Sequence, residues 1–182
     1  MIETIRIGTL LRETAATPYH NLITRPAGAA VRDRIEAALA ESRCLIALLD
    51  FSDIGVIDFS GADEAVAKLL LAATGPGRPV VVLQGLREDQ HEAIERVLIH
   101  HELAVIVVPC ADGGSMPQLI GCVTPDGREA FGCLCECGAQ QSFHLARTLG
   151  WSESRAQETL RALLERRLVH GDGDIFLPIT IA

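Results

Sequence analysis

Apolar residues along this chain form short, nearly uninterrupted runs, and segments with helical spacing of apolar residues lie between them. Three runs have the length of a strand: Cys44–Leu49, Pro79–Leu86 and Leu103–Val108. A run that short and that apolar is typical of a strand buried on both faces. Two amphipathic segments, Pro26–Ser42 and Glu88–His101, have the spacing of helices. The alternation predicts βαβ units and a parallel sheet.

A third helix is predicted between the first two runs, over Ser60–Ala73. Ser60 is expected to cap this helix, with Asp63 and Glu64 placing negative charge at its positive end. The helix is apolar almost all round, whereas one inward stripe would need fewer apolar positions. Because leftover apolar surface is commonly an interface, the segment favours a homodimer over a monomer.

Weaker patterns lie outside this central region. Ile5–Leu11 alternates loosely and predicts an opening strand, and Tyr19–Ile23 predicts a second short one. The segment Pro109–Pro117 is rich in turn formers and predicts a linker. Leu119–Val123 follows it as a short strand or connecting arm.

From Pro125 the pattern changes to three helices and a hairpin. The first helix is predicted over Asp126–Cys137, and the next two are expected to be capped by Ser142 and Ser152. Leu168–His170 and Ile175–Leu177 are spaced to pair across a turn. Four residues of the third helix are spaced to face a core: Ala156, Leu160, Leu163 and Leu164. The change of pattern predicts two domains, 1–118 and 119–182.

The segments LLDFSDIGVIDFSGADEAVAKLL and TRPAGAAVRDRIEAAL resemble STAS domains of the anti-sigma-factor-antagonist type, and more closely the STAS-like domains of uncharacterised bacterial proteins. The resemblance implies an α/β sheet-and-helix domain whose loop, Asp58, Phe59, Ser60 and Gly61, is a partner surface. In phosphorylatable STAS proteins the serine directly after the aspartate is the switch. Phe59 occupies that position here, so we expect a domain that is not a serine-phosphorylation target.

The segment SFHLARTLGWSESRAQETLRALLERRLVHGDGDIFLPI resembles a small winged helix-turn-helix domain. The matching features are the xLAxxLG second helix, the serine-initiated third helix and the exit into a wing. The resemblance implies that the third helix reads DNA. Its outward candidates for DNA contact are Ser154, Arg155, Gln157 and Arg161, and arginine and glutamine are suitable readers of base edges.

Charge limits the partners that this chain can have. The 182 residues include 16 Lys and Arg and 24 Asp and Glu, a net charge of −8, which argues against indiscriminate nucleic-acid binding and against an anionic membrane surface. No run approaches the roughly 18 apolar residues of a membrane span. The N-terminus lacks a secretory pattern, so the six cysteines are expected to be reduced thiols of a cytoplasmic protein.

Residues that could carry chemistry give little support for an enzyme. On a helix Cys133 and Cys137 would share a face and Cys135 would point nearly opposite, so we predict no metal site, with a cysteine-based metal or redox sensor as the weakest alternative. Carboxylates gather around the central loop, but no nucleophile–base pair stands near them. Those carboxylates are Asp50, Asp58, Asp63 and Glu64. The sequence predicts no catalytic residue and no cofactor.

Two functions remain open. The leading one is a non-enzymatic bacterial transcriptional regulator, with the winged helix binding DNA and the STAS-like domain mediating protein or self-association. The alternative is a protein-interaction adaptor of a partner-switching (anti-sigma) pathway that binds no DNA. From residue 119 on, the sequence has six arginines and eight acidic residues, and Asp172 and Asp174 lie in the predicted wing. This excess of acidic residues disfavours contact with phosphate, so the adaptor remains the alternative function.

Overall fold

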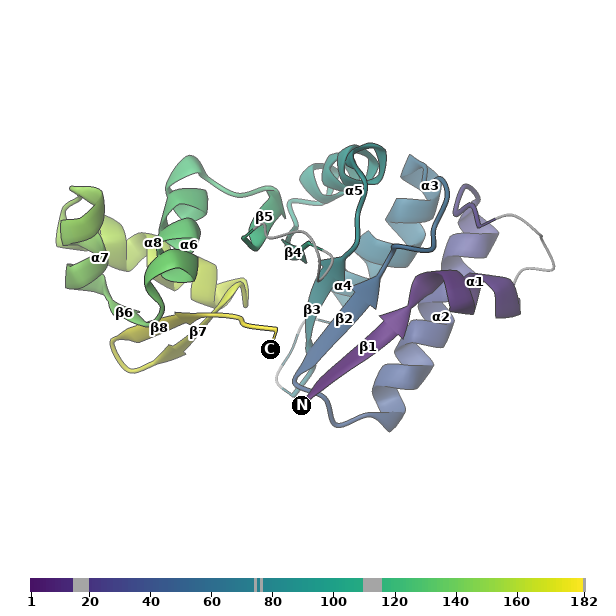
Figure 1. The fold of residues 1–182 in the computed structure, drawn as a ribbon, viewed down its shortest axis with the longest axis horizontal. Helices are drawn as coiled ribbons and strands as arrows, with labels where there is room; N and C mark the ends of the chain where they lie inside the picture. The colour runs from purple at the N-terminus through teal and green to yellow at the C-terminus, as the bar shows by residue number, and fades with distance from the viewer. Residues whose placement is uncertain (15–19, 74, 76, 110–115, 182) are drawn as a thin grey trace. The chain divides into compact units, whose positions relative to one another are not determined.

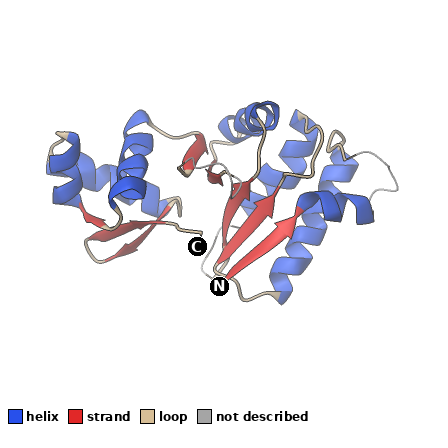
Figure 2. Ribbon diagram, viewed as in Figure 1, coloured by secondary structure: helices blue, strands red, loops and turns tan. Residues whose placement is uncertain are grey.

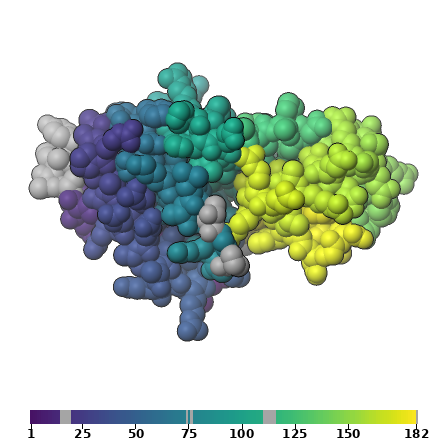
Figure 3. Space-filling model, turned by 180° about the vertical axis from the view of Figure 1, so that it is seen from behind, coloured from purple at the N-terminus to yellow at the C-terminus, as the bar shows by residue number. Residues whose placement is uncertain are grey.

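The computed structural model describes residues 1–14, 20–73, 75, 77–109 and 116–181. They form two compact units, one from residues 1–114 and 120–122 and the other from 115–119 and 123–182. In Figures 1 and 3 the first unit runs from purple to teal and the second from green to yellow. The division lies close to residue 118, but residues 120–122 return to the first unit. Most of the predicted linker, residues 110–115, lies outside the described residues.

A five-stranded sheet forms the frame of the first unit (Figure 1). Its strands lie in sequence order: β1 (Ile2–Arg6), β2 (Ile46–Asp50), β3 (Val80–Gln84), β4 (Ala104–Val108) and β5 (Gln118–Gly121). The first four are parallel, which agrees with the βαβ units predicted from the apolar runs of β2, β3 and β4. Because crossovers between parallel strands are nearly always right-handed, this order places the connecting helices on one face.

The helices of the first unit pack side by side in one layer (Figure 2). They are α1 (Ile7–Thr14), α2 (Arg25–Glu41), α3 (Phe59–Ala62), the π-helix η1 (Asp63–Ala67), α4 (Lys68–Ala72) and α5 (Glu88–His100). Since α3, η1 and α4 follow one another without a break, they make one helix, here called the central helix. It lies between α2 and α5 and contacts both.

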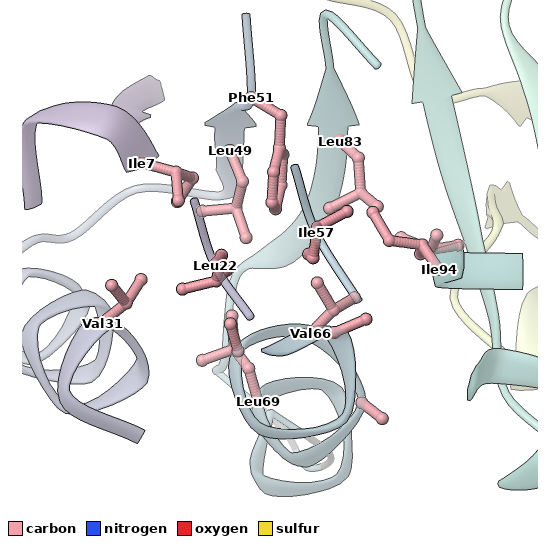
Figure 4. Packing of buried hydrophobic residues seen from close by; sticks show 14 of the residues in the cluster. Ile7, Leu22, Val31, Leu49, Phe51, Ile57, Val66, Leu69, Leu83 and Ile94 are labelled. Carbon is pink, nitrogen blue, oxygen red and sulfur yellow. The ribbon is translucent and has the colours of Figure 1, made fainter. Parts of the chain in front are cut away.

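The core of the first unit lies between the sheet and the central helix. Leu49 and Leu83 point from the strands toward Val66 and Leu69 of the central helix (Figure 4). Burying an aliphatic side chain of this size stabilises the fold by about 1.5–3 kcal/mol. The other face of the strands is buried too, with Leu48, Val82 and Ile106 all at most 5% exposed. This two-sided burial explains why the strands are continuous apolar runs.

The N-terminal prediction was partly wrong. The expected strand Ile5–Leu11 ends at Arg6, and the chain continues as α1. Ile7 and Leu11 are one helical turn apart and fully buried, so their packing favours a helix. Of the predicted strand Tyr19–Ile23, Leu22 makes an isolated parallel bridge to Ile57, and Tyr19 lies outside the described residues.

The central helix begins earlier than the sequence suggested. Asp58 caps it, accepting a hydrogen bond from the Gly61 N–H at 2.8 Å, so the prediction that Ser60 is the cap was wrong. Every residue from Gly61 to Ala67 is buried, because neighbours cover the helix on several sides. The apolar surplus behind the homodimer prediction is thus used within the unit, and among the described residues of this helix only Phe59 and Leu71 are large exposed apolar side chains. The homodimer stays a prediction.

The second unit pairs three helices with a small antiparallel sheet. In chain order its elements are α6 (Pro125–Cys137), β6 (Gln140–Gln141), α7 (Ser142–Leu149), α8 (Glu153–Glu165), β7 (Val169–Asp172) and β8 (Ile175–Pro178). The strand order in the sheet is β6-β8-β7. The three helices and the hairpin therefore follow the prediction.

The helix predictions in the second unit are confirmed in part. Ser152 caps α8 by accepting from the Arg155 N–H at 3.3 Å. Ser142 does not cap α7; it is the first residue of that helix, and Gln141 holds the cap position. Of the four predicted core residues in α8, Leu164 is 37% exposed, since it lies at the border of the buried stripe.

Helix length bears on the membrane prediction. The longest described α-helix, α2, has 17 residues. Among the described residues, no helix is both long and apolar enough to cross a bilayer.

We predict that Gly61→Ala strongly destabilises the first unit. A Cβ at Gly61 would collide with the Leu22 carbonyl, whose carbon would lie 2.7 Å away, and backbone cannot yield as a flexible side chain can. The expected loss is about 3 kcal/mol, the upper part of the overpacking range, measured by urea unfolding. Gly132→Ala is the matched control: its Cβ would meet nothing within 4 Å in the interior of α6, so it should stabilise by about 0.5–1 kcal/mol. Equal effects of the two variants would contradict the close approach.

Candidate functional site

Helix α8 carries the four residues predicted to contact DNA. Ser154, Arg155 and Arg161 are exposed, and Gln157 is half-buried. Ala156, Leu160 and Leu163 turn the opposite side of the helix into the core. The structure therefore places all four candidates on one exposed helix, with Ser154 donating a hydrogen bond to Glu158 at 3.1 Å. Whether they touch DNA stays a prediction.

Arg155 is held by an interaction that the sequence did not reveal. Its Nε and Nη2 donate to the two carboxylate oxygens of Asp126 at 2.7 and 2.6 Å. The guanidinium carbon lies 4.3 Å from the ring centroid of Trp151. The hydrogen bonds from Arg155 lower the pKa of Asp126, and the same bonds raise the pKa of Arg155. We call these three residues the Arg155 clamp.

The rest of the second unit's surface has mixed character. Among the described residues, Arg161 has no ion-pair partner, so no acidic side chain neutralises its charge. The hairpin instead exposes Asp172 and Asp174. Ile175 and Leu177, on the same face of β8, are 43% and 37% exposed. Apolar and acidic groups on a hairpin suit a protein surface better than a phosphate backbone.

The predicted partner loop of the first unit presents one side chain. Phe59 is 43% exposed and meets His100 of α5 edge to face, with 5.9 Å between ring centroids. Asp58 is occupied as the helix cap, and Gly61 is buried. Ser60 is half-buried on the first turn. Of the four loop residues, Phe59 is therefore the one with an exposed side chain, and its role as a partner surface stays a prediction.

Two buried carboxylates next to this loop are each paired with several basic groups. Asp63 and Glu64 are each 6% exposed although both are acidic. Asp63 accepts from Arg25 at 2.7 Å and binds Nε2 of His101 at 2.6 Å. Glu64 accepts from Arg32 at 2.8 Å, from Arg25 at 3.1 Å and from Lys68. We call these residues the acid-pair cluster.

The backbone explains why both acids point inward. They open the π-helix η1, whose wider turn is rare and often found at functional sites. Gly28 lets α2 approach, because a Cβ there would lie 2.7 Å from the Cβ of Glu64. Arg25 and Arg32 come from α2, and His101 ends α5. The acids thus tie both neighbouring helices to the central one.

Sequence reasoning placed Asp63 and Glu64 at the helix start but missed their burial. Burial alone would raise the pKa of Asp63, but hydrogen bonds from His101 and Arg25 outweigh it and lower that pKa. The hydrogen bond from Lys68 is the largest cause that lowers the pKa of Glu64. The basic residues Arg25, Arg32 and Lys68 could have indicated that the two acids are paired, although only the fold brings Arg25 and Arg32 near them. Removing one partner of a buried ion pair is strongly destabilising, so these paired carboxylates contribute to holding the helices together.

In α6, Cys133 and Cys137 lie close together, as the helical spacing implied, and Cys135 lies apart from them. Cys133 is buried, Cys135 half-buried and Cys137 exposed. Burial raises the pKa of Cys133 to about 11, with the neighbouring Cys137 adding to the shift, and burial raises that of Cys135 to about 11 as well. Both are therefore protonated at neutral pH, which makes them poor nucleophiles. Cys110 lies outside the described residues.

Comparison with protein-family models and with curated proteins finds no match to this chain.

We predict that the acid-pair cluster makes folding stability fall in acid. Because folding lowers the pKa of Asp63 and Glu64, their contribution is complete above the ordinary values of 3.8 and 4.5 and is lost as pH falls through the lower folded values. The urea midpoint should hold from pH 7 to about 5 and drop below about 4. Glu64→Gln should cost roughly 1–3 kcal/mol at pH 7 and flatten the drop.

The control for this experiment is Glu92→Gln. Glu92 also pairs with a basic residue one turn away, Arg96, but its side chain is 65% exposed. An exposed pair contributes about 0–1 kcal/mol, so the control should retain both the stability and the acid drop. If Glu64→Gln retained them as well, the acid-pair cluster would not hold the helices together.

Proposed function

We propose that this protein is a DNA-binding transcriptional regulator whose second unit is a winged helix-turn-helix domain. The observation that carries the proposal is the order of its elements: helix, strand, two helices and a hairpin, with strands in the order β6-β8-β7. In winged helix-turn-helix domains the second helix of the pair enters the major groove. Here that helix is α8, which has an exposed face and a buried core stripe.

DNA contact in this proposal is concentrated in a few residues. Arg161 is exposed and can contact DNA, and Gln157 and Ser154 lie on the same helix. The protein carries a net charge of −8, so nonspecific attraction to phosphate is weak. Binding then depends on the specific contacts of α8, and each should matter more than it would in a strongly basic domain.

In the same proposal the first unit is a STAS-like domain that provides protein or self-association. The presentation of Phe59 beside His100 supports the loop as the contact surface. The absence of a serine directly after Asp58 supports control by association rather than phosphorylation.

We predict that Arg161→Glu weakens binding of the preferred DNA by about 5–150-fold, which corresponds to the 1–3 kcal/mol of one specific interaction with a base. The preferred sequence is first selected from a random duplex pool with the wild-type chain, and affinity is then measured by fluorescence anisotropy at several salt concentrations. If Arg161 also neutralises a backbone phosphate, the slope of log affinity against log salt should become shallower by about 0.9 in the variant.

Arg96→Glu is the matched control, since it reverses an exposed arginine on α5 of the first unit, within an ion pair whose arginine side chain is 72% exposed. It makes the same change of net charge, and it should leave the DNA affinity close to wild type. Equal losses of affinity in the two variants would indicate an effect of net charge alone and would count against α8 as the reading helix.

A second candidate is the adaptor that binds protein and no DNA. The exposed Ile175 and Leu177 on the hairpin, next to Asp172 and Asp174, favour it. The selection experiment separates the two functions: a well-folded wild-type chain that enriches no sequence from the pool would decide for the adaptor.

A further inference from the structure

The Arg155 clamp holds an arginine fork in the geometry used for anion recognition. Two parallel N–H groups of Arg155 meet both oxygens of Asp126 at 2.7 and 2.6 Å. This bidentate arrangement fits carboxylate and phosphate alike, because both can present two oxygens to the fork. Asp126 thus occupies the position that a phosphate would take on this guanidinium.

Trp151 supports one face of that fork. The guanidinium carbon of Arg155 lies 4.3 Å from the ring centroid, while two N–H groups at the edge of the guanidinium donate to Asp126. A cation over an indole face is attracted by the electrons of the ring, and this attraction does not depend on which anion the fork holds. The ring can keep the fork oriented when its anion changes, which lowers the cost of exchanging one anion for another.

The interaction with Asp126 is open enough to be exchanged. The side chains of Arg155 and Asp126 are 48% and 36% exposed, so water screens their attraction and can solvate both groups when they separate. Asp126 lies on α6, 29 residues before Arg155, so it is no i,i+4 neighbour fixed by one helix. Both residues can therefore separate without unfolding α8.

We propose that Asp126 is a built-in competitor of DNA: it occupies the anion position of Arg155 in the free protein, and a backbone phosphate of DNA displaces it in the complex. This inference rests on the proposed DNA-binding function. It assigns Asp126 as a residue that sets affinity, and it assigns Arg155 to phosphate rather than to a base. Binding releases Asp126 into water, so each binding event is weakened by the strength of the pair.

The test is the affinity of Asp126→Asn for DNA, measured with the full chain. Asparagine keeps the shape but loses the charge that holds the fork, so binding should become about two- to fivefold tighter, the factor that matches an exposed ion pair. Because Arg155 is assigned to phosphate, the gain should be the same on the preferred sequence and on a scrambled duplex of equal length. Thermal unfolding checks that the variant is folded.

Two further variants separate the clamp from net charge. Glu129→Gln removes one acid from the same helix; Glu129 is exposed and acts on Arg155 through its field, whereas Asp126 acts through hydrogen bonds. It should give a smaller gain than Asp126→Asn. In an Arg155→Ala background, Asp126→Asn should lose most of its gain, because the competitor then has nothing to hold.

The measured affinities distinguish failure of the inference from failure of the proposed function. A gain that depends on Arg155 and appears on both duplexes supports the inference. Wild-type binding with no gain in Asp126→Asn, or an equal gain in the Arg155→Ala background, overturns the inference while the proposed function stands. A gain confined to the preferred sequence overturns the phosphate assignment. Binding by neither wild type nor Asp126→Asn, with both folded, overturns the proposed function and the inference with it.

Discussion

The central helix of the first unit can be buried only because bases from both neighbouring helices meet its two carboxylates. A buried carboxylate without a partner would cost several kcal/mol, which is comparable with the stability of a whole domain. Arg25 and Arg32 from α2 and His101 after α5 remove that cost. The requirement fixes how α2 and α5 lie against the central helix, and it leaves Phe59 at the exposed end of the same helix.

The pattern of burial also explains which secondary-structure predictions succeeded. The strands β2, β3 and β4 could be predicted because both of their faces are apolar, which leaves a continuous run in the sequence. Helix α1 could not, because Ile7 and Leu11 fit a loose alternation as well as a helical turn, and packing decides between them. Ser60 and Asp58 are both good helix caps, and only the approach of the Gly61 N–H shows which one acts.

The candidate site was predictable in part for a similar reason. Helical spacing placed Ser154, Arg155, Gln157 and Arg161 on the side of α8 away from Ala156 and Leu160, and none of the four is part of the buried core. Spacing says nothing of Asp126, which is distant in sequence and is brought to Arg155 by the packing of α6 against α8. Asp63 and Glu64 show the same limit, since the distances to α2 and α5 come from the fold. Sequence patterns indicate the side that a residue faces, while its partner is decided by tertiary structure.

The two ionic clusters differ in what their exposure permits. Glu64 is 6% exposed and is met by three basic groups, so opening that cluster would strand charge in a low-dielectric interior. The Arg155 clamp is partly exposed to water, so separating its ion pair strands no charge in the interior and another anion can replace the carboxylate. The acid-pair cluster is therefore suited to holding helices together, and the clamp is suited to exchange. In an acidic chain, an arginine that already holds an anion discriminates against weak contacts, because a new ligand must outcompete Asp126 before it is bound.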